Sequence, residues 1–563
     1  MKWKRPIIKN YITLWFIASA FLLGAAQCTK TEEETYIVEK EPVIDKSYFP
    51  ENVLPVLNEA QERTFRYFWD ESTEAGIVQG TGLAAEGSQR HNVVTIGGAG
   101  FGVMATIAGV ERGWISRDQG IERLQLGLDF LTNKAVRFGG IWPHWINPNT
   151  GSDNMFNSTK GGVKKPSGDM VESCFMLSAL LMAREYYDAN TPAEIEIRET
   201  INEIYAAVDW KLYTNGQNQL HWIYFPENEN GEVEYTLPIR GWNEALICYV
   251  LALGAPNTNV DVSIYDGWRG SMKNVHNAYG YSLNLRPTKG GPMFLSHYSM
   301  LGLNPTKMED DLTNYWQHVT THAMVNRHHC VYEAPSNFKY NEGTWGLTAC
   351  YGGTNGYSAR NPNNDDGTIA PTAALGSYPY VPFYATQYLI NTISKHPKAY
   401  GKYGFVDAYN PENNWYEDRH LAIDQGPIVV MMENYRSGLF YDLLMKCPEI
   451  QTGLTKMGIS EPNYKTGFHL AIPDVKTTYY DAMMHPDLGK YQIDFYLEKA
   501  SNISFYLEDI ADKKTIELVT NQPYQQGSNQ LEFSWKENII PGKKYTLYMN
   551  TDNQEYTLKV ILH

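Results

Sequence analysis

The sequence predicts an all-α domain of the toroid type, with alternating inner and outer helices, followed by a small C-terminal β-sandwich. Two observations support this prediction. Helix-like apolar spacing dominates from about residue 53 to residue 455, and long loops rich in Gly, Asn, Pro and aromatic residues separate the helical segments. After about residue 475 the pattern changes to short alternating runs separated by turn residues. No internal repeat is detected, so the prediction of a ring of helices depends on the helical segments alone.

The first domain is predicted to span residues 53–460. Its helical segments have apolar residues at helical spacing, which gives each helix one face for the core. These segments are Leu57–Trp69, Gly102–Val110, Gln119–Leu131, Met170–Tyr187, Ala193–Val208, Asn243–Leu253, Thr372–Ser394 and Gly426–Met445. Long loops in a compact domain are usually functional, so ligand contacts are expected between these helices.

The second domain is predicted to span residues 475–563. Its runs alternate apolar and polar residues and are separated by turn residues such as Pro541-Gly542, a spacing typical of a small immunoglobulin-like sandwich. The predicted strands are Tyr491–Leu497, Ile503–Leu507, Thr515–Val519, Leu531–Trp535, Tyr545–Met549 and Tyr556–Ile561. The pattern leaves open whether this module stabilises the chain, acts as a spacer or binds carbohydrate.

The N-terminus has the pattern of a lipoprotein signal peptide over residues 1–27. Basic residues precede an apolar run from Tyr11 to Ala26, which is too short and wrongly flanked for a spanning helix. The run leads to Leu23-Gly-Ala-Ala-Gln-Cys28, which resembles a lipobox with Cys28 as the lipid-anchored residue. Gln27 departs from the small residue usual at that place. Ordinary secretion with an unused cysteine therefore stays an alternative.

Residues 28–52 are polar and charged and are predicted to form a tether. Lys30 and the acidic run Glu32–Glu34 resemble the surface-export signal of lipoproteins in the Bacteroides group. We therefore expect an outer-membrane lipoprotein exposed on the cell surface, with a periplasmic location as the alternative. Contact with the membrane is expected only through the lipid anchor, and the chain is expected to be a monomer.

The composition excludes several classes of partner and chemistry. The net charge is −16, which opposes binding to nucleic acid and to anionic membrane surfaces but does not affect a neutral polysaccharide. The six cysteines include no CxxC pair, and GxSxG, HExxH and P-loop motifs are absent. Asn363–Gly367 lacks the first and last acidic ligands of an EF-hand loop. No metal and no cofactor are therefore expected.

Acidic residues at helix starts carry the clearest chemical signal. Asp169 and Glu172 lie three apart at the start of one predicted helix, Glu244 precedes a nearly all-apolar helix, and Asp424 starts a third. Apolar surroundings raise the pKa of a carboxyl group, which suits a general acid. The same positions also suit helix caps and acids favoured by the helix dipole, so spacing alone leaves both interpretations open.

Aromatic and histidine-rich loops supply the expected substrate contacts, because the C–H faces of sugar rings stack on aromatic rings. Glu433 is also expected to contact substrate, although its spacing from Arg436 equally allows a simple ion pair. The candidate substrate-binding residues are Trp142, His144, Trp242, His297, Trp345 and Glu433.

From about Phe65 to Gly453 the chain resembles the bacterial "glycoamylase" domain of glycoside hydrolase family 144. The matching segments are Phe65–Asp70, Gly109–Trp114, Asp169–Glu172, Gly241–Glu244, Asp366–Thr372, Asp424–Pro427 and Glu433–Gly438. The resemblance implies an all-α (α/α)6 toroid that hydrolyses β-1,2-glucan, endo or exo, with inversion. By position, Asp169, Glu172, Glu244 and Asp424 match the family's essential acids. Within that set, Glu244 is expected to be the general acid and Asp424 the general base. Related toroidal β-1,2-glucanases relay the proton of the acid through a substrate hydroxyl, so the resemblance implies no fixed distance between the two carboxyl groups.

Two other functions stay open at this stage. A polysaccharide lyase would also fit a toroid and could use His144, His221 or His297 as its base, although the acidic charge balance disfavours an anionic substrate. A surface glycan-binding lipoprotein would use the aromatic loops but would not need the set of acids. A hydrolase acting on another polysaccharide is the remaining variant.

Overall fold

The computed structural model describes residues 44–72, 74–226, 231–270 and 272–563. The chain divides into two units, Met1–Val43 and Ile44–His563, and only the second falls within these ranges. The predicted signal peptide of residues 1–27 and the predicted anchor Cys28 lie outside the described residues. The predicted tether of residues 28–52 is wrong at its C-terminal end. Helix α1 begins at Pro50, and a proline suits the first helical position because the missing N–H would have no partner there.

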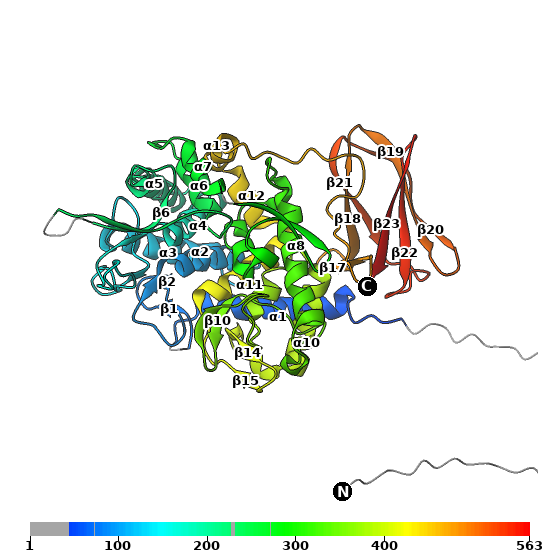
Figure 1. The fold of residues 1–563 in the computed structure, drawn as a ribbon, viewed down its shortest axis with the longest axis horizontal. Helices are drawn as coiled ribbons and strands as arrows, with labels where there is room; N and C mark the ends of the chain where they lie inside the picture. Colours follow the sequence, from blue (N-terminus) through cyan, green and yellow to red (C-terminus); the bar gives the residue numbers. More distant parts are fainter. Residues whose placement is uncertain (1–43, 73, 227–230, 271) are drawn as a thin grey trace, which may run out of the picture. The chain divides into compact units, whose positions relative to one another are not determined.

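Residues 50–456 are mainly helical (Figure 1). The helices are α1 (Pro50–Trp69), α2 (Ile96–Glu111), α3 (Arg117–Asp129), α4 (Met170–Tyr186), α5 (Pro192–Ala206), α6 (Leu246–Gly254), α7 (Ser263–Arg269), α8 (Tyr315–His328), α9 (Pro371–Leu375), α10 (Pro382–Lys395), α11 (Ala422–Ser437), α12 (Leu439–Lys446) and α13 (Pro448–Lys456). All the predicted helical segments fall within these helices or overlap them. None of the helices in the described ranges is both long and apolar enough to cross a membrane.

Two predicted helices are each divided in the structure. The segment Thr372–Ser394 is split into α9 and α10, with Pro382 opening the second helix after a non-helical Val381. The segment Gly426–Met445 is split into α11 and α12 at Gly438, whose φ of 75° is the left-handed conformation that ends helices. Helix α8 was not predicted because it is buried nearly all round and has no apolar stripe.

The inner part of this domain is built around α2. Helix α2 packs against α4 and α11, while α4 also packs against α6. Gly100 permits the contact with α4, since a Cβ there would lie 2.7 Å from the Met176 Cα. Short hairpins connect the helices, including β3 (Val94–Thr95) with β4 (Trp145–Ile146) and β10 (Ala349–Gly352) with β11 (Gly356–Ala359). Helix starts and hairpins thus come together at one end of α2, α4 and α11.

The C-terminal strands form two sheets around a separate core (Figure 1). A five-stranded sheet has the order β16-β23-β22-β19-β20, and a three-stranded sheet has the order β17-β18-β21. The strands are β16 (Tyr480–Ala482), β17 (Met484–His485), β18 (Lys490–Leu497), β19 (Ser501–Asp509), β20 (Thr515–Tyr524), β21 (Gly527–Ser534), β22 (Lys544–Asn550) and β23 (Glu555–Leu562). Side chains from both sheets, such as Phe495 and Phe505, share one hydrophobic cluster. All the predicted strands are present.

Candidate active site

The starts of four helices open into one cavity of about 370 Å³. Thr95 is the N-cap of α2, Glu172 lies in the first turn of α4, Glu244 precedes α6, and Ile423 lies in the first turn of α11. The remaining lining side chains come from the connecting loops and hairpins. They are Glu86, Arg90, His144, Trp145, Phe156, Phe294, Tyr298, Ala349, Tyr351, Tyr357 and Ala359. The cavity is large enough for a small organic ligand and combines aromatic walls with carboxyl groups.

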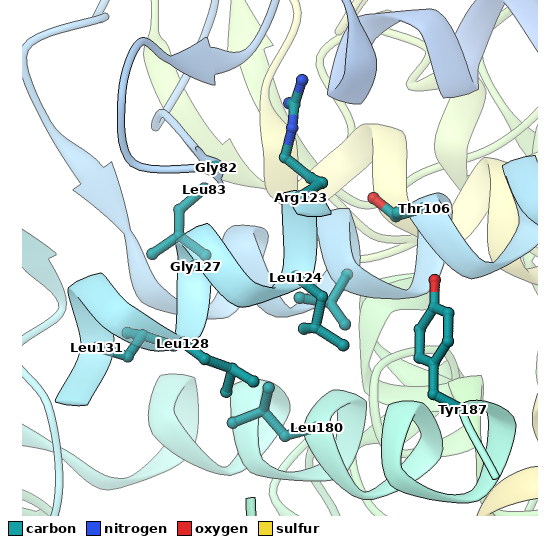
Figure 2. Close-up of a pocket in the computed structure, with 11 residues that line it drawn as sticks. Gly82, Leu83, Thr106, Arg123, Leu124, Gly127, Leu128, Leu131, Leu180 and Tyr187 are labelled. Carbon is teal, nitrogen blue, oxygen red and sulfur yellow. The ribbon is translucent and has the colours of Figure 1, made fainter. Parts of the chain in front are cut away.

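A second cavity is a packing gap rather than a ligand site. It lies between α2, α3 and α4 and has a volume of about 20 Å³. Figure 2 shows Leu124, Leu128 and Leu180 pointing toward one another from two helices, with Tyr187 at the side. A volume of this size holds about one water molecule, and leucine is the commonest residue in its walls. It carries no group suited to acid–base chemistry.

Asp169 and His144 form an ion pair beside Glu172. Asp169 is the N-cap of α4: its Oδ1 accepts from the Glu172 N–H at 3.2 Å, and its Oδ2 lies 2.9 Å from His144 Nδ1. Burial lowers the pKa of His144, but the negative charge of Glu172 and the hydrogen bond to Asp169 outweigh it and raise that pKa to about 9. At neutral pH, His144 is therefore an imidazolium. Asp169 therefore caps helix α4, which is one of the two interpretations that the sequence left open.

Glu172 lies against the backbone of α2 at a glycine. A Cβ on Gly97 would lie 1.9 Å from Glu172 Oε2, so no larger residue fits without moving the carboxyl group. Burial raises the pKa of Glu172 to about 8, helped by the charges of Asp169, Glu86 and Glu244 and opposed by His144. The two groups act on each other: the negative charge of Glu172 favours the protonated form of His144, and that cation opposes the protonation of Glu172.

Glu244 lies in the loop before α6, two residues earlier than the helix start Leu246. The predicted helix over Asn243–Leu253 therefore begins late, and Glu244 is not part of its first turn. Burial raises the pKa of Glu244 to about 7. A carboxyl group that lines the cavity and is half protonated near neutral pH can act as a proton donor.

Asp424 lies in the first turn of α11 and is almost fully buried, at 1% exposure. Neither of its carboxylate oxygens has a hydrogen-bond donor among the described residues. Burial raises its pKa well above the ordinary value, and the charge of the neighbouring Asp407 adds to this effect. Asp424 does not line the cavity itself. Its charge helps to raise the pKa of Tyr298 and of Tyr357, and both of these tyrosines line the cavity.

Two acids of this region were missed from the sequence. Glu86 lines the cavity and accepts from Trp145 Nε1 at 2.8 Å, and its backbone oxygen accepts from the first residue of α11. Asp407 is buried beside Asp424. The available signal for Asp407 was a lone acid between the apolar residues Val406 and Ala408. Glu86 lies in a Gly- and Ser-rich loop with no comparable signal.

Aromatic rings form the outer part of the cavity wall. Phe156 is 40% exposed and stacks on His144 with the ring centroids 3.9 Å apart. Arg90 lies over Trp145 at 4.4 Å. Tyr357 is 48% exposed, and its ring centroid lies 5.3 Å from that of Tyr351. These exposed rings, rather than the predicted tryptophans, are available for stacking on a sugar.

Only one of the six predicted substrate-binding residues, His144, lines the cavity. The other five are buried, with at most 4% exposure, and do not line the cavity, so their contact with substrate stays a prediction. They are Trp142, Trp242, His297, Trp345 and Glu433.

Each of these five has a clear role in packing. Trp142 and Trp345 donate their indole N–H to backbone oxygens, and Trp242 packs on Tyr315. His297 bonds to Ser377, and Glu433 forms a bidentate ion pair with Arg112. A loop position was therefore a poor guide to exposure.

No cluster of three or more His, Cys, Asp or Glu residues within the described ranges could hold a metal ion. Asp366, from the loop that resembles a calcium site, instead binds Arg360 through both carboxylate oxygens at 2.7 and 2.9 Å. The polar side chains that line the cavity include carboxyl groups, the His144 imidazole and tyrosine hydroxyls.

Comparison with known proteins places the chain in a family. Residues 236–448 match the glycoamylase family model, described as "Putative glucoamylase". An exo β-1,2-glucooligosaccharide sophorohydrolase (non-reducing end) from Parabacteroides distasonis is 34% identical over 440 residues, which are 74% of this chain and 59% of that protein. The chain thus spans about three fifths of that curated relative.

Solved structures agree with this match. An endo-β-1,2-glucanase from Chitinophaga pinensis, in complex with sophorotriose and glucose, is 41% identical with a TM-score of 0.66, covering 72% of this chain and 98% of that one. A β-1,2-glucanase from Parabacteroides distasonis is 33% identical with a TM-score of 0.67, covering 73% and 60%. The chain therefore belongs to the glycoamylase-domain family, glycoside hydrolase family 144.

Proposed function

We propose that this protein is a glycoside hydrolase that cleaves β-1,2-glucan to short gluco-oligosaccharides. The observation that carries the proposal is a single cavity where helix starts bring together Glu172, Glu244 and, behind its wall, Asp424. Glycoside hydrolysis needs one carboxyl group that gives a proton and one carboxylate that activates water. The choice of the β-1,2 linkage comes from the relatives, whose names state activity on β-1,2-linked glucans.

The proposed mechanism is inverting. Glu244, whose pKa is about 7, protonates the leaving glycosidic oxygen. Asp424 removes a proton from the water that attacks the anomeric carbon from the opposite face. Glu172 and His144 bind substrate hydroxyls, and Asp169 holds His144 through its Nδ1 and leaves Nε2 for the ligand. Phe156 and Tyr357 provide the stacking surfaces for sugar rings.

Product analysis tests both the substrate and the stereochemistry. Linear β-1,2-glucan is incubated with the protein, the products are separated by chromatography, and the first anomer released is identified by NMR. Sophorose-type products that appear first as the α-anomer support an inverting β-1,2-glucanase. No turnover of this polymer together with turnover of starch or β-1,3-glucan would overturn the substrate assignment. The product lengths also decide between endo and exo action.

A lyase mechanism is disfavoured by the state of the histidines. A lyase base must be a neutral imidazole or a tyrosinate near the substrate. Burial lowers the pKa of His297 to about 3, yet this histidine is buried away from the cavity, while His144 is an imidazolium at neutral pH. A non-catalytic glycan-binding protein has no use for buried carboxyl groups that lack hydrogen-bond partners, which cost folding energy.

We further propose that residues 53–460 form an (α/α)6 toroid and residues 475–563 a β-sandwich of the immunoglobulin type. The convergence of four helix starts on one cavity supports an inner ring of helices. The separate hydrophobic cluster of the C-terminal strands supports a second domain. Limited proteolysis between residues 460 and 475 followed by mass spectrometry tests these boundaries, and cleavage within either core would contradict them.

We propose that the protein is a monomeric outer-membrane lipoprotein exposed on the cell surface and anchored through Cys28. The N-terminal sequence pattern supports this proposal. Metabolic labelling with a fatty-acid probe is expected to mark the wild type and not Cys28→Ala. Protease treatment of intact cells then separates surface exposure from a periplasmic location, and light scattering on the soluble Cys28→Ala form gives the oligomeric state.

A further inference from the structure

A further cavity, of about 220 Å³, lies between the helical part of the chain and the C-terminal strands. One side of its wall includes residues of α8, α11 and α12, and the other side includes residues of β16, β17, β18 and β21. We call it the junction cavity, and its lining residues include Trp316, Tyr435, Tyr480, His485 and Asp494. None of these five residues lines the active-site cavity.

Helix α11 separates the two cavities. Ile423, in its first turn, lines the active-site cavity, and Tyr435, near its end, lines the junction cavity. With a rise of about 1.5 Å per residue, these two positions are about 18 Å apart along the helix. The junction cavity is therefore a second place on the protein, and a ligand the size of one sugar ring could not occupy both.

Hydrogen bonds join the two sides of the junction cavity. His485 Nε2, on β17, lies 3.1 Å from the backbone oxygen of Tyr435 on α11. Arg436, the next residue of α11, binds both carboxylate oxygens of Asp487 at 2.9 and 2.6 Å. The wall is thus held in place by contacts within the protein, and a preformed site of this kind loses little freedom when a ligand binds.

Several polar groups in the wall have no partner among the described residues. His485 is 6% exposed, and its Nδ1 makes no hydrogen bond there. Burial lowers the pKa of His485, so the ring is neutral at neutral pH. Nε2 then donates to the Tyr435 oxygen, and Nδ1 is left as an acceptor. Asp494 accepts from Gln530 Nε2 at 3.0 Å through one oxygen only, and the hydroxyls of Tyr435 and Tyr480 are also unbonded within these ranges.

The lining residues indicate the chemical class of a ligand. Aromatic rings, among them Trp316, Tyr380 and Tyr441, alternate with polar groups, and the lining contains no Lys or Arg. An anionic ligand would therefore find no cation. Burial raises the pKa of the one lining acid, Asp494, which favours a neutral ligand beside it. The volume is below the range of about 300–1,000 Å³ usual for larger ligands, so a single ring fits better than a chain.

We propose that the junction cavity is a second carbohydrate-binding site, which takes one sugar unit of a neutral glucan or of its product. Sugar hydroxyls would bond to His485 Nδ1, the free Asp494 oxygen and the two tyrosine hydroxyls, and the C–H face of the ring would pack on the aromatic wall. The C-terminal strands thereby gain a binding role that they share with the helices. The choice of β-1,2-linked glucose as the sugar rests on the proposed function, whereas the site itself does not.

Tyr435→Phe and Tyr480→Phe test the site in solution. Both are made in the full chain with Glu244→Gln, which is intended to prevent turnover, and sophorose is titrated by calorimetry. Each change removes one hydroxyl that has no partner in the described protein, so the melting temperature should hold. Sophorose binding at one of two sites is expected to weaken about threefold to tenfold for each variant, the usual effect of one lost hydrogen bond.

Tyr548→Phe, on β22, is the matched control, because Tyr548 lines neither cavity. It should bind sophorose as the parent does. Equal affinities in all three variants would overturn the proposal. Crystals soaked with sophorose locate the ligand: a sugar in the junction cavity supports the site. Sugar in the active-site cavity alone, or binding at crystal concentration only, overturns it. Binding of tetramethylammonium there in place of any sugar also overturns it, since the aromatic wall and acid would then serve a cation.

Repeating the titration with maltose and cellobiose separates this proposal from the proposed function. If one of these sugars binds in the junction cavity and sophorose does not, the site stands and the choice of β-1,2-linked glucose fails. If the wild type cleaves β-1,2-glucan while no sugar distinguishes Tyr435→Phe and Tyr480→Phe from the control, the function stands and the second site is wrong.

Discussion

Asp169 and Asp424 occupy similar places in the sequence, each at the start of a helix that continues in apolar residues, but their surroundings differ. Both are 1% exposed. Asp169 uses one oxygen to cap α4 and the other to bind His144. Neither carboxylate oxygen of Asp424 has a hydrogen-bond donor within the described ranges. The first acid is fully satisfied and stabilises the fold. The second is costly to bury, and such groups are typical of functional sites.

Replacing Asp424 is the strongest test of this comparison. Asp424→Asn is expected to lower kcat on β-1,2-glucan by about 10²–10⁴, the usual contribution of a positioned general base. The melting temperature is expected to hold or rise, because the variant removes a buried acid without good partners. Kinetics and differential scanning fluorimetry on the same preparation give both numbers. A kcat within threefold of the wild type would remove Asp424 from the mechanism.

Glu244 extends the comparison to an acid outside any helix. Its pKa of about 7 means that the protonated form decreases as the pH rises through that value. If Glu244 is the general acid, kcat/KM of the wild type falls above about pH 7. Glu244→Gln is expected to lower kcat by a factor of about 10²–10⁴. In this variant, kcat/KM should no longer fall above about pH 7. Glu111→Gln, at an exposed acid in the last turn of α2, is the control and is expected to keep the wild-type profile.

The carboxyl group of Glu172 occupies the space that a side chain at Gly97 would fill. Gly97→Ala places a methyl group where Glu172 Oε2 lies, at 1.9 Å, so the carboxyl group must move. A displacement of about 1 Å in a catalytic site can cost about 10² in rate, and a loss of that order in kcat/KM is expected. Gly102→Ala in the same helix meets the Phe68 ring at 3.1 Å and the Ala84 Cβ at 3.6 Å, and is the matched control. Equal losses in both variants would assign the effect to helix packing.

The sequence predicted the local features of this site and not the long-range ones. Asp169, Glu172 and Asp424 were found because an acid before an apolar helical run is a local pattern. Nothing local in the sequence indicated that Trp142 and Trp345 are buried and donate their indole N–H groups to backbone oxygens. Asp407 lies in a loop before α11, and no local sequence pattern links it to Asp424.

The same limit explains the errors in the fold. Helices with an apolar stripe were predicted, since their burial follows a simple period. Helix α8 was missed because it is surrounded by protein on nearly all sides and includes His318, His322 and Asn326 among its buried residues. Asn326 donates to the distant Leu347 oxygen and His322 bonds to the Gly291 oxygen, whereas His318 has no hydrogen-bond partner among the described residues. The spacing of apolar residues along a sequence does not indicate distant hydrogen-bond partners of this kind.

The smallest effect is expected at Asp169 and divides its two roles. Asp169→Asn keeps a good N-cap but removes the charge beside His144, whereas Asp169→Ala removes both and should cost about 1 kcal/mol more in unfolding free energy. Because the folded-state pKa of His144, about 9, exceeds its usual 6.5, the stability from its protonated form is complete below about pH 6.5 and is lost as the pH rises through about 9.

Urea unfolding at pH 6 and pH 9.5 measures this loss. The wild type should lose about 1–3 kcal/mol more between these values than Asp169→Asn, in which the pKa of His144 returns toward its usual value. The charge of Asp169 also raises the pKa of Glu172, so the difference between the two proteins reports His144 and Glu172 together. An equal pH dependence would mean that Asp169 acts only as a cap, and the contrast with Asp424 would then lie in hydrogen bonding rather than in charge.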